Sequence, residues 1–204
     1  MQGAHLENGI KLPEPRYDGR ISVEHALANR RSVRRFSTNS LTLSEFSQLL
    51  WSAQGISSPK GYRTAPSAGA LYPLELYALA GKVQDLPAGI YKYITGAHAL
   101  LPIVAGDRRN NICRAALQQD SVAAAPAVFL FCAVNERVTR TYGDRGIRYI
   151  FMEIGHAAQN VCLQAIALGL ETVVIGAFRD NDVKRIAHLG EDERPAYIVP
   201  IGRK

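Results

Sequence analysis

The sequence has few cysteines and no long apolar run, and each absence excludes a class of protein. The three cysteines, Cys113, Cys132 and Cys162, lie far apart and form no Cys-x-x-Cys pair, which argues against a zinc site or a disulfide framework. We expect three buried thiols in a protein of the reducing cytoplasm. No apolar run reaches about 18 residues, so we expect no membrane span. The first residues also lack the basic start and apolar core of a signal peptide.

Several motifs of well-known sites are missing. The chain contains neither Gly-x-Gly-x-x-Gly nor Gly-x-x-x-x-Gly-Lys-Ser/Thr, so it lacks the glycine-rich cradle of common nucleotide sites. Gly-x-Ser-x-Gly and His-Glu-x-x-His are absent too. Glu153 and His156 form a single Glu-x-x-His, whereas a carboxylate-bridged di-iron bundle needs two such units. We therefore expect no metal, and we predict that His156 is a hydrogen-bonded residue of the core.

What the sequence does contain is enough apolar material for one full core. The 204 residues are 47% hydrophobic, and 24 Lys and Arg against 18 Asp and Glu give a net charge of +6, which favours anionic ligands. Positive charge is densest in RRSVRRF, residues 30–36. Taken alone, this cluster fits a DNA phosphate, a membrane surface, a cofactor phosphate or plain solvation. No helix-turn-helix pattern and no second basic stripe accompany it, so we do not expect a nucleic-acid partner.

Helix signals are strongest at two places. Thr42 and Glu45 have the spacing of a capping box, and apolar residues at helical spacing follow as far as Gly55. A wide apolar face extends over residues 147–168, about six turns, and Gly169 closes it. Shorter helices are predicted after Ser22 as N-cap, over 107–119, and after Asp180 as N-cap.

Strand signals alternate irregularly with these helices. The continuous apolar run at 127–134 is typical of a central strand, and residues 56–73 are rich in Gly, Pro and Ser, as in a loop. Residues 1–20 indicate an extended N-terminal arm, and residues 21–204 a single domain without internal repeats. We predict the α+β class. The remaining strands are predicted at 74–80, 89–93, 100–104, 172–178 and 196–201.

Four segments in order carry a resemblance that covers residues 20–204. They are RRSVRRF after a short helix, APSAGALYPLELYAL from loop into strand, ALGLETVVIGAF after a long helix, and PIGRK near the end. Together they resemble the FMN-dependent nitroreductase family, and more narrowly its branch related to SagB-type dehydrogenases, which oxidise azolines in thiazole/oxazole-modified peptides. The resemblance implies a mostly antiparallel sheet packed around a long core helix, an intertwined homodimer, and one FMN per subunit at the dimer interface.

The resemblance also implies roles for individual residues. Arg34 is the candidate for the pyrimidine end of the flavin, while Arg35 has no matched role and is expected at the surface or at a dimer contact. The segment that holds the FMN phosphate and ribityl chain is matched by Arg30, Arg31, Ser32 and Arg34, with Arg203 as a second phosphate-binding cation. The loop against the partner's isoalloxazine ring is matched by Pro66, Ser67, Ala68 and Gly69. The loop beside flavin N5 is matched by Ile175, Gly176, Ala177 and Phe178.

These assignments agree with elementary chemistry. Without a glycine-rich cradle, phosphate charge must be neutralised by side chains, for which the planar fork of Arg and a Ser hydroxyl are well suited. Small residues at 66–69 would leave room for a stacked ring. Each loop also has a simpler interpretation, as a Gly/Pro turn before a strand at 66–69 and as an ordinary strand end at 175–178.

The implied reaction passes hydride from NADH or NADPH through flavin N5 to a small conjugated electrophile such as a nitroaromatic or a quinone. Azoline dehydrogenases of the branch carry an adjacent Lys-Tyr pair before the long helix, and here the comparable residues are Thr141 and Tyr142. Threonine has no basic nitrogen to take up a proton, which counts against azoline oxidation. Azoline oxidation with dioxygen as acceptor is therefore the alternative to the reductase, and a flavin-free basic binding module is a second alternative. Tyr142 is the candidate catalytic residue if it lines the pocket, and otherwise a surface-loop tyrosine.

Overall fold

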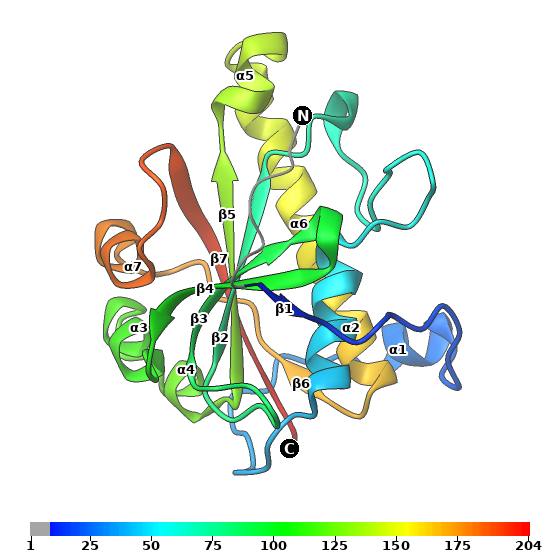
Figure 1. Ribbon diagram of the computed structural model, residues 1–204, viewed down its shortest axis with the longest axis vertical. Coiled ribbons are helices and arrows are strands. Elements are labelled where there is room, and N and C mark those ends of the chain that lie inside the picture. The colour runs from blue at the N-terminus through cyan, green and yellow to red at the C-terminus, as the bar shows by residue number, and fades with distance from the viewer. Residues whose placement is uncertain (1–8) are drawn as a thin grey trace.

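A seven-stranded antiparallel sheet forms the centre of the protein in the computed structural model, which describes residues 9–204 (Figure 1). The strands lie in the order β1-β4-β3-β2-β5-β7-β6. Every residue of the central strand β5 is buried, because helices cover both faces of the sheet there. The strands are β1 Ile10–Lys11, β2 Leu74–Ala80, β3 Gly89–Ile94, β4 Ala99–Ala105, β5 Ala127–Val134, β6 Glu171–Thr172 and β7 Glu193–Gly202.

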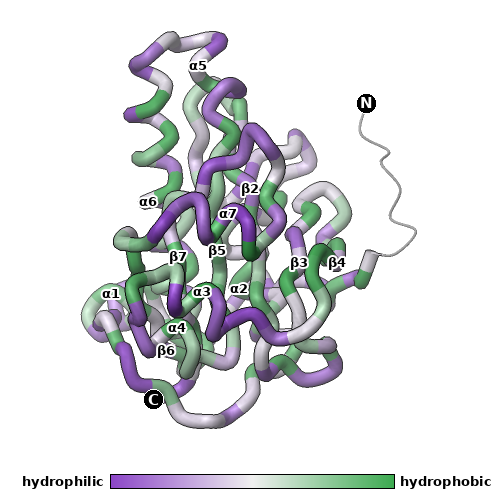
Figure 2. The backbone as a smooth tube through the Cα atoms, turned by 90° about the vertical axis from the view of Figure 1, so that its left-hand side faces the viewer, coloured by the Kyte–Doolittle hydropathy of each residue, from purple (hydrophilic) through white to green (hydrophobic). Residues whose placement is uncertain are grey.

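Two groups of helices cover the two faces of this sheet (Figure 1). Side chains of β5 alternate between them: Phe129 and Phe131 belong to the core with α2 and α6, whereas Val128, Leu130 and Cys132 belong to the core with α3, α4 and α7. Figure 2 shows the strands as mainly apolar and many of the turns around them as hydrophilic. The helices are α1 Val23–Asn29, α2 Leu43–Gln54, α3 Arg109–Ala115, α4 Asp120–Ala124, α5 Glu136–Tyr142, α6 Arg145–Ala167 and α7 Asp180–Ala187.

The long helix α6 organises one of the two cores. Ile150, Ile154, Ala157 and Val161 recur at helical spacing and are buried against α2 and the sheet. Gly169 follows with φ +69°, the left-handed conformation that commonly ends a helix. The predicted α+β fold, with an antiparallel sheet packed around a long core helix, is therefore confirmed.

Local signals also placed the starts of two helices correctly. The Ser22 hydroxyl accepts from His25 N at 3.2 Å and caps α1. At α2 the reciprocal capping box is complete: Thr42 N donates to Glu45 Oε2 at 2.8 Å, and Glu45 N donates to Thr42 Oγ1 at 3.2 Å. The three cysteines are buried and free, as predicted.

Other predictions need correction. The helix predicted over 107–119 is broken after α3, because Leu117 and Gln118 adopt left-handed φ angles of +56° and +60°. The strand predicted over 172–178 reduces to β6 and an isolated bridge between Ile175 and Ile198. Asp180 is the first residue of α7 and not its N-cap, and α5 was not predicted.

The histidine of the Glu-x-x-His pair was also predicted wrongly. His156 is exposed on the outer face of α6, while Glu153 is buried. Among residues 9–204, no group of three or more His, Cys, Asp or Glu side chains could hold a metal ion. None of the helices in the same range is long and apolar enough to span a membrane.

The N-terminal arm is partly joined to the sheet. Ile10 and Lys11 pair with Leu100 and Ala99 at the sheet edge, and Leu12 is buried behind them. Residues 13–22 continue without regular structure to α1. The first part of the predicted arm, residues 1–8, lies outside the described residues.

Candidate functional site

The residues singled out from the sequence lie near two ends of α6. In Figure 1, the chain after α1 and the C-terminus lie at the bottom, while α5 and the short 3-10 turn Ala68–Ala70 lie at the top. Ser67 faces Glu153 on α6, and Arg30 lies near Cys162 on the same helix. At 1.5 Å per residue, these two α6 positions are about 13 Å apart along the helix axis.

The backbone of the basic segment is fixed at the edge of the sheet. Ser32 forms a parallel bridge with Thr172 of β6, and Val33 N donates to the Thr172 carbonyl at 2.9 Å. Ser37 N donates to the Arg203 carbonyl at 2.8 Å. The structure therefore brings the arginine cluster and the C-terminal segment together, although they are far apart in the sequence.

The arginine side chains in this region are not equivalent. Arg31 Nη1 donates to the carbonyls of Ala28 and Arg30, at 3.0 and 2.8 Å, near the C-terminal end of α1. Arg203 donates to the Ser40 carbonyl at 2.9 Å and forms an ion pair with Glu45. Within residues 9–204, the side chains of Arg30 and Arg34 make no hydrogen bond or ion pair. Of the four predicted phosphate-binding cations, these two are the ones without a partner in the described part of the chain.

The predicted loop at 175–178 follows β6, whose Thr172 bridges Ser32. Ile175 is buried and exchanges two backbone hydrogen bonds with Ile198, at 2.9 and 3.0 Å, while Gly176 and Ala177 are exposed. Phe178 packs against the core on the α7 side of the sheet, and the Ala177 carbonyl accepts from Gln119 at 3.0 Å. The loop thus offers small exposed residues on a backbone anchored at both ends.

The predicted loop at 66–69 has an unusual backbone. Gly69, Ala70 and Tyr72 all have left-handed φ angles, +61°, +52° and +47°. Such angles cost energy for residues with a side chain and are often found at functional sites. The Ser67 hydroxyl accepts from Tyr72 N at 2.9 Å and closes the turn.

Tyr142, the candidate catalytic residue, lies against this loop. It is the last residue of α5, it is 37% exposed, and its ring packs edge-on against Tyr149 at 5.2 Å between centroids. A Cβ atom at position 69 would lie 2.9 Å from the Tyr142 hydroxyl oxygen. The structure therefore brings Tyr142 and Gly69 into contact.

Sequence reasoning missed a buried polar cluster behind the same loop. Glu153 is 2% exposed, and its Oε1 atom has no hydrogen-bond partner among the described residues. Burial raises the pKa of Glu153 to about 7, against the opposing effects of Ser67 and Arg63. Arg63 donates to Gln54 Oε1 at 2.7 Å and lies 4.4 Å from the centre of the Tyr72 ring. The sequence signal that could have revealed this cluster was the carboxylate of Glu153 within the apolar face of α6.

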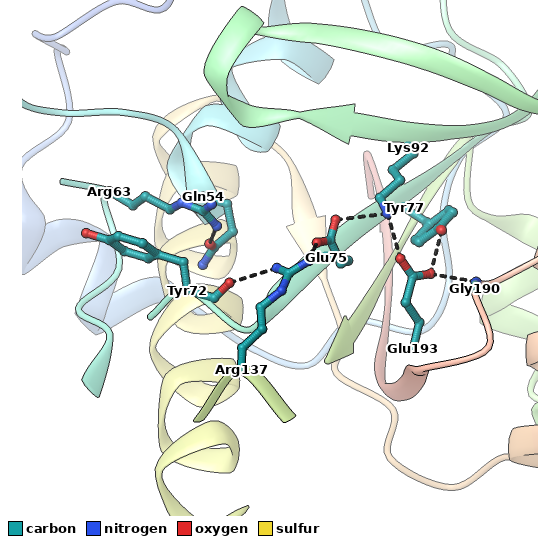
Figure 3. A network of polar contacts seen from close by, with 9 residues as sticks. All are labelled: Gln54, Arg63, Tyr72, Glu75, Tyr77, Lys92, Arg137, Gly190 and Glu193. Atoms are coloured by element: carbon teal, nitrogen blue, oxygen red, sulfur yellow. Dashed lines mark hydrogen bonds and ion pairs between the residues drawn. The ribbon is translucent and has the colours of Figure 1, made fainter. Parts of the chain in front are cut away.

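Further ion pairs tie the loop to the centre of the sheet (Figure 3). Arg137 of α5 donates to the Tyr72 carbonyl at 3.0 Å and pairs with Glu75 at 2.5 Å. Lys92 pairs with Glu75 at 3.0 Å and with Glu193 at 2.6 Å, while the Tyr77 hydroxyl donates to Glu193 at 2.6 Å. These contacts fix the start of β2, and with it the end of the loop.

The pKa values in this network follow from the same contacts. Burial alone would raise the pKa of Glu193, but hydrogen bonds from Lys92 and Tyr77 outweigh it and lower that pKa. Burial and the bond to Glu193 raise the pKa of Tyr77. Lys92 is thus held charged between two carboxylates, as expected of a residue that stabilises the sheet.

A cavity of about 870 Å³ lies between the N-terminal arm, α1, α2 and α6. Its walls include Tyr17 and Trp51, which pack edge-on at 5.5 Å, together with Gln48 and Gln164. None of the site residues predicted from the sequence lines it. The predicted residues therefore lie apart from this cavity, and Ile175 and Phe178 belong to the core on the α7 side of the sheet.

The model of the Nitroreductase family matches residues 27–203 of the chain. The protein belongs to the nitroreductase family. A relative from Methanocaldococcus jannaschii, provisionally named a nitroreductase, is 44% identical over 96% of both chains. McbC of Escherichia coli, a microcin B17-processing protein, is 29% identical over 96% of this chain and 77% of its own.

A solved structure agrees with this assignment. The crystal structure of a provisionally assigned nitroreductase from Ralstonia eutropha has a TM-score of 0.84 and 31% identity, covering 96% of this chain and 89% of the other. The family inferred from the four sequence segments is confirmed. In this nitroreductase-family chain, Arg30 and Arg34 are unpaired among the described residues, and Tyr142 lies against a loop with left-handed φ angles.

Proposed function

We propose that this chain is an FMN-dependent oxidoreductase that uses NADH or NADPH to reduce a small conjugated electrophile, such as a nitroaromatic or a quinone. The observation that carries the proposal is that two guanidinium groups, Arg30 and Arg34, have no partner among residues 9–204 and lie on either side of the exposed Ser32. The backbone between them, at Ser32 and Val33, is anchored to Thr172, so the chain that carries both side chains is fixed before any ligand binds.

These residues fit a flavin phosphate. A dianionic phosphate accepts several hydrogen bonds, and each bond to a charged donor is worth about 1.5–3 kcal/mol. Arg30, Arg34 and the Ser32 hydroxyl supply such donors without a glycine-rich cradle. The Arg31 guanidinium already donates to a carbonyl of α1. Arg203 would bind the phosphate only if it gave up its ion pair with Glu45.

The flavin, when bound, supplies hydride transfer at N5, and the protein residues bind and orient it. Gly176 and Ala177 are small and exposed, so backbone amides there can approach a planar ring closely. At the other end of α6, the small residues Ala68 and Gly69 leave a ring face open, while Tyr142 supports the loop from behind. Arg34 is the candidate to stabilise negative charge at the pyrimidine end of the ring.

We further propose that two copies assemble, as the resemblance implies. The outer face of α6 exposes Phe151 and Met152, which are 63% and 52% accessible. Large exposed apolar residues on one face are typical of a protein interface. An antiparallel pairing of two α6 helices would bring the 66–69 loop of one copy to the arginine segment of the other, so that both ends contribute to each flavin.

A second candidate is the oxidation of azolines or related substrates with dioxygen as acceptor. The observation that favours it is the similarity to McbC, a microcin B17-processing protein, together with Tyr142 against the predicted ring-binding loop. Against it, Thr141 cannot take up a proton as the lysine of the Lys-Tyr pair can. Reduction of an electrophile is therefore the favoured direction.

Purified protein tests the proposal. It should be yellow and release about one FMN per chain on denaturation, and FMN should raise its melting temperature. Anaerobic bleaching by NADH or NADPH would favour the reductase, whereas bleaching only by an azoline substrate would favour the second candidate. A colourless protein that FMN does not stabilise would leave a flavin-free basic binding module.

A further inference from the structure

Arg203 lies at the end of β7, close to the segment that carries the arginine cluster. Ser32 bridges Thr172 of β6, and Thr172 pairs in turn with Ile201 of β7. Because neighbouring strands lie about 4.8 Å apart, Ser32 and Ile201 are about 10 Å apart across β6. Arg203 follows Ile201 by two residues, so its long side chain can reach a phosphate bound beside Ser32.

The Arg203 guanidinium is already held by the segment that leads into α2. Its Nη1 donates to the Ser40 carbonyl at 2.9 Å, and its Nη2 donates to Glu45 Oε1 in an ion pair. The side chains of Arg203 and Glu45 are 29% and 17% exposed, so salt and water screen this pair less than a fully exposed one. An internal anion therefore already neutralises the cation that the sequence matches to the phosphate.

The carboxylate of Glu45 has a second contact that keeps it in place. Its other oxygen, Oε2, accepts from Thr42 N at 2.8 Å and completes the capping box of α2. The partial positive charge at the start of a helix also favours a carboxylate in the first turn. Glu45 therefore keeps a hydrogen bond and a favourable field when Arg203 leaves it, so the guanidinium can exchange partners.

We propose that Glu45 competes with the ligand phosphate for Arg203 and thereby limits how tightly that phosphate is held. The inference rests on the proposed flavin function and concerns the phosphate end of its site. Glu45 is a positioning residue in this account, because it acts on the ligand through the Arg203 guanidinium.

A count of hydrogen bonds gives the size of the effect. In the wild type, Arg203 gives up a bond to a charged acceptor when it gains one to the phosphate, so the net gain in affinity is small. With Glu45→Gln, Arg203 gives up only a bond to a neutral acceptor for the same gain. The difference between a charged and a neutral hydrogen bond corresponds to about a tenfold change in affinity.

The test is a double-mutant cycle on Glu45 and Arg203, with FMN affinity followed by flavin fluorescence. Glu45→Gln should bind FMN about tenfold more tightly than the wild type does. Arg203→Ala should change the affinity of the wild type by less than about threefold, but should weaken that of Glu45→Gln by about tenfold. Glutamine in a capping box still accepts from Thr42 N, so α2 should keep its start.

The matched control is Glu14→Gln, which changes the net charge by the same amount at an exposed pair with Lys11. Its FMN affinity should stay within about twofold of the wild-type value, because exposed charges are screened. If Glu14→Gln and Glu45→Gln tighten binding equally, net charge sets the affinity and the inference is wrong.

The cycle itself gives the second outcome that would overturn the inference. If the effects of Glu45→Gln and Arg203→Ala on FMN affinity simply add, Glu45 does not act through Arg203. Should Glu45→Gln not fold, Arg203→Ala alone still decides. A loss of about tenfold or more in FMN affinity, in an otherwise wild-type chain, would mean that Arg203 binds the phosphate without competition from Glu45.

Inorganic phosphate separates this inference from the proposed function, because it probes the same cations without the flavin ring. If FMN binds and the two substitutions add, the role of Glu45 is wrong and the flavin proposal stands. If FMN binds to none of the proteins, the flavin proposal fails, and calorimetric titration with phosphate decides the role of Glu45. Tighter phosphate binding by Glu45→Gln that Arg203→Ala removes would support the inference, and phosphate binding by none of them would overturn it.

Discussion

The hydroxyl oxygen of Tyr142 lies in the space that a side chain at position 69 would enter. A Cβ atom there would be 2.9 Å from this oxygen, a distance that real Cβ contacts hardly ever show. Gly69 also has φ +61°, which residues with a side chain adopt at a cost. The backbone therefore favours glycine at this position, and a side chain there would also displace the Tyr142 hydroxyl.

Gly69→Ala should lower the free energy of unfolding by about 2 kcal/mol, from the left-handed backbone and from the forced shift of Tyr142. Gly61→Ala is the matched control, since Gly61 has φ +80° and open space around it. It should cost only about 1 kcal/mol. Denaturant unfolding of both variants measures the difference.

Tyr142→Phe removes the hydroxyl and isolates the packing part of this cost. In the Gly69→Ala background it should recover most of the excess over Gly61→Ala, because the nearest remaining ring atom is 3.5 Å from the added Cβ. Equal costs for Gly69→Ala and Gly61→Ala would show that Tyr142 does not pack against the loop.

Arg30→Ala should weaken FMN binding by about tenfold or more, because one charged hydrogen bond is worth about 1.5–3 kcal/mol. Arg31→Ala should have a smaller effect, since the Arg31 guanidinium is occupied by carbonyls at the end of α1. Titration of the apoprotein with FMN measures both. Equal losses for Arg30→Ala and Arg31→Ala would contradict the division between free and occupied arginines.

Much of the fold could be predicted from the sequence, because helix caps and apolar runs are formed by residues that are close together in the chain. The capping box at Thr42 and Glu45 and the apolar run of β5 were both predicted from short windows. The short helix α5 was missed because its sequence, ERVTRTY, has three β-branched residues and no strong apolar period. The predicted helix over 107–119 failed at Leu117 and Gln118, whose backbone is set by the turn to α4.

The site was less accessible to sequence reasoning, because partners come from distant parts of the chain. The pairing of Arg203 with Glu45 spans 158 residues, so the sequence did not show that this cation is occupied. Glu153 was considered only as half of a metal motif. Its importance depends on burial under Ser67 and Arg63, which only the packed structure defines.

Lys92→Met should destabilise the protein by about 3 kcal/mol, because it leaves the carboxylate of Glu193 without its cation and Glu75 with Arg137 alone. The lowered pKa of Glu193 means that its ionised form stabilises the fold above the pKa of the unfolded state, and this contribution is lost on acidification. The destabilisation by Lys92→Met should therefore shrink at low pH. Lys11→Met, at an exposed pair with Glu14, is the control and should cost less than about 0.5 kcal/mol.

Glu153→Gln should change stability in a pH-dependent way that follows from its raised pKa. The pKa rises from 4.5 to about 7 on folding, so between these values the unfolded chain loses the proton more readily, and wild-type stability falls as pH rises. Below about pH 4 both states are protonated, and above about pH 8 both are ionised, so the fall is confined to the interval between the two pKa values.

Glutamine cannot ionise, so Glu153→Gln should gain stability relative to wild type by about 3 kcal/mol between about pH 4.5 and pH 8. Urea unfolding of both proteins at about pH 5 and pH 8 measures this change, and groups that titrate identically in both cancel in the difference. Glu14→Gln, at an exposed carboxylate, provides the matched control and should show no such trend. A constant difference between wild type and Glu153→Gln across this range would mean that the Glu153 carboxyl titrates as it does in the unfolded chain.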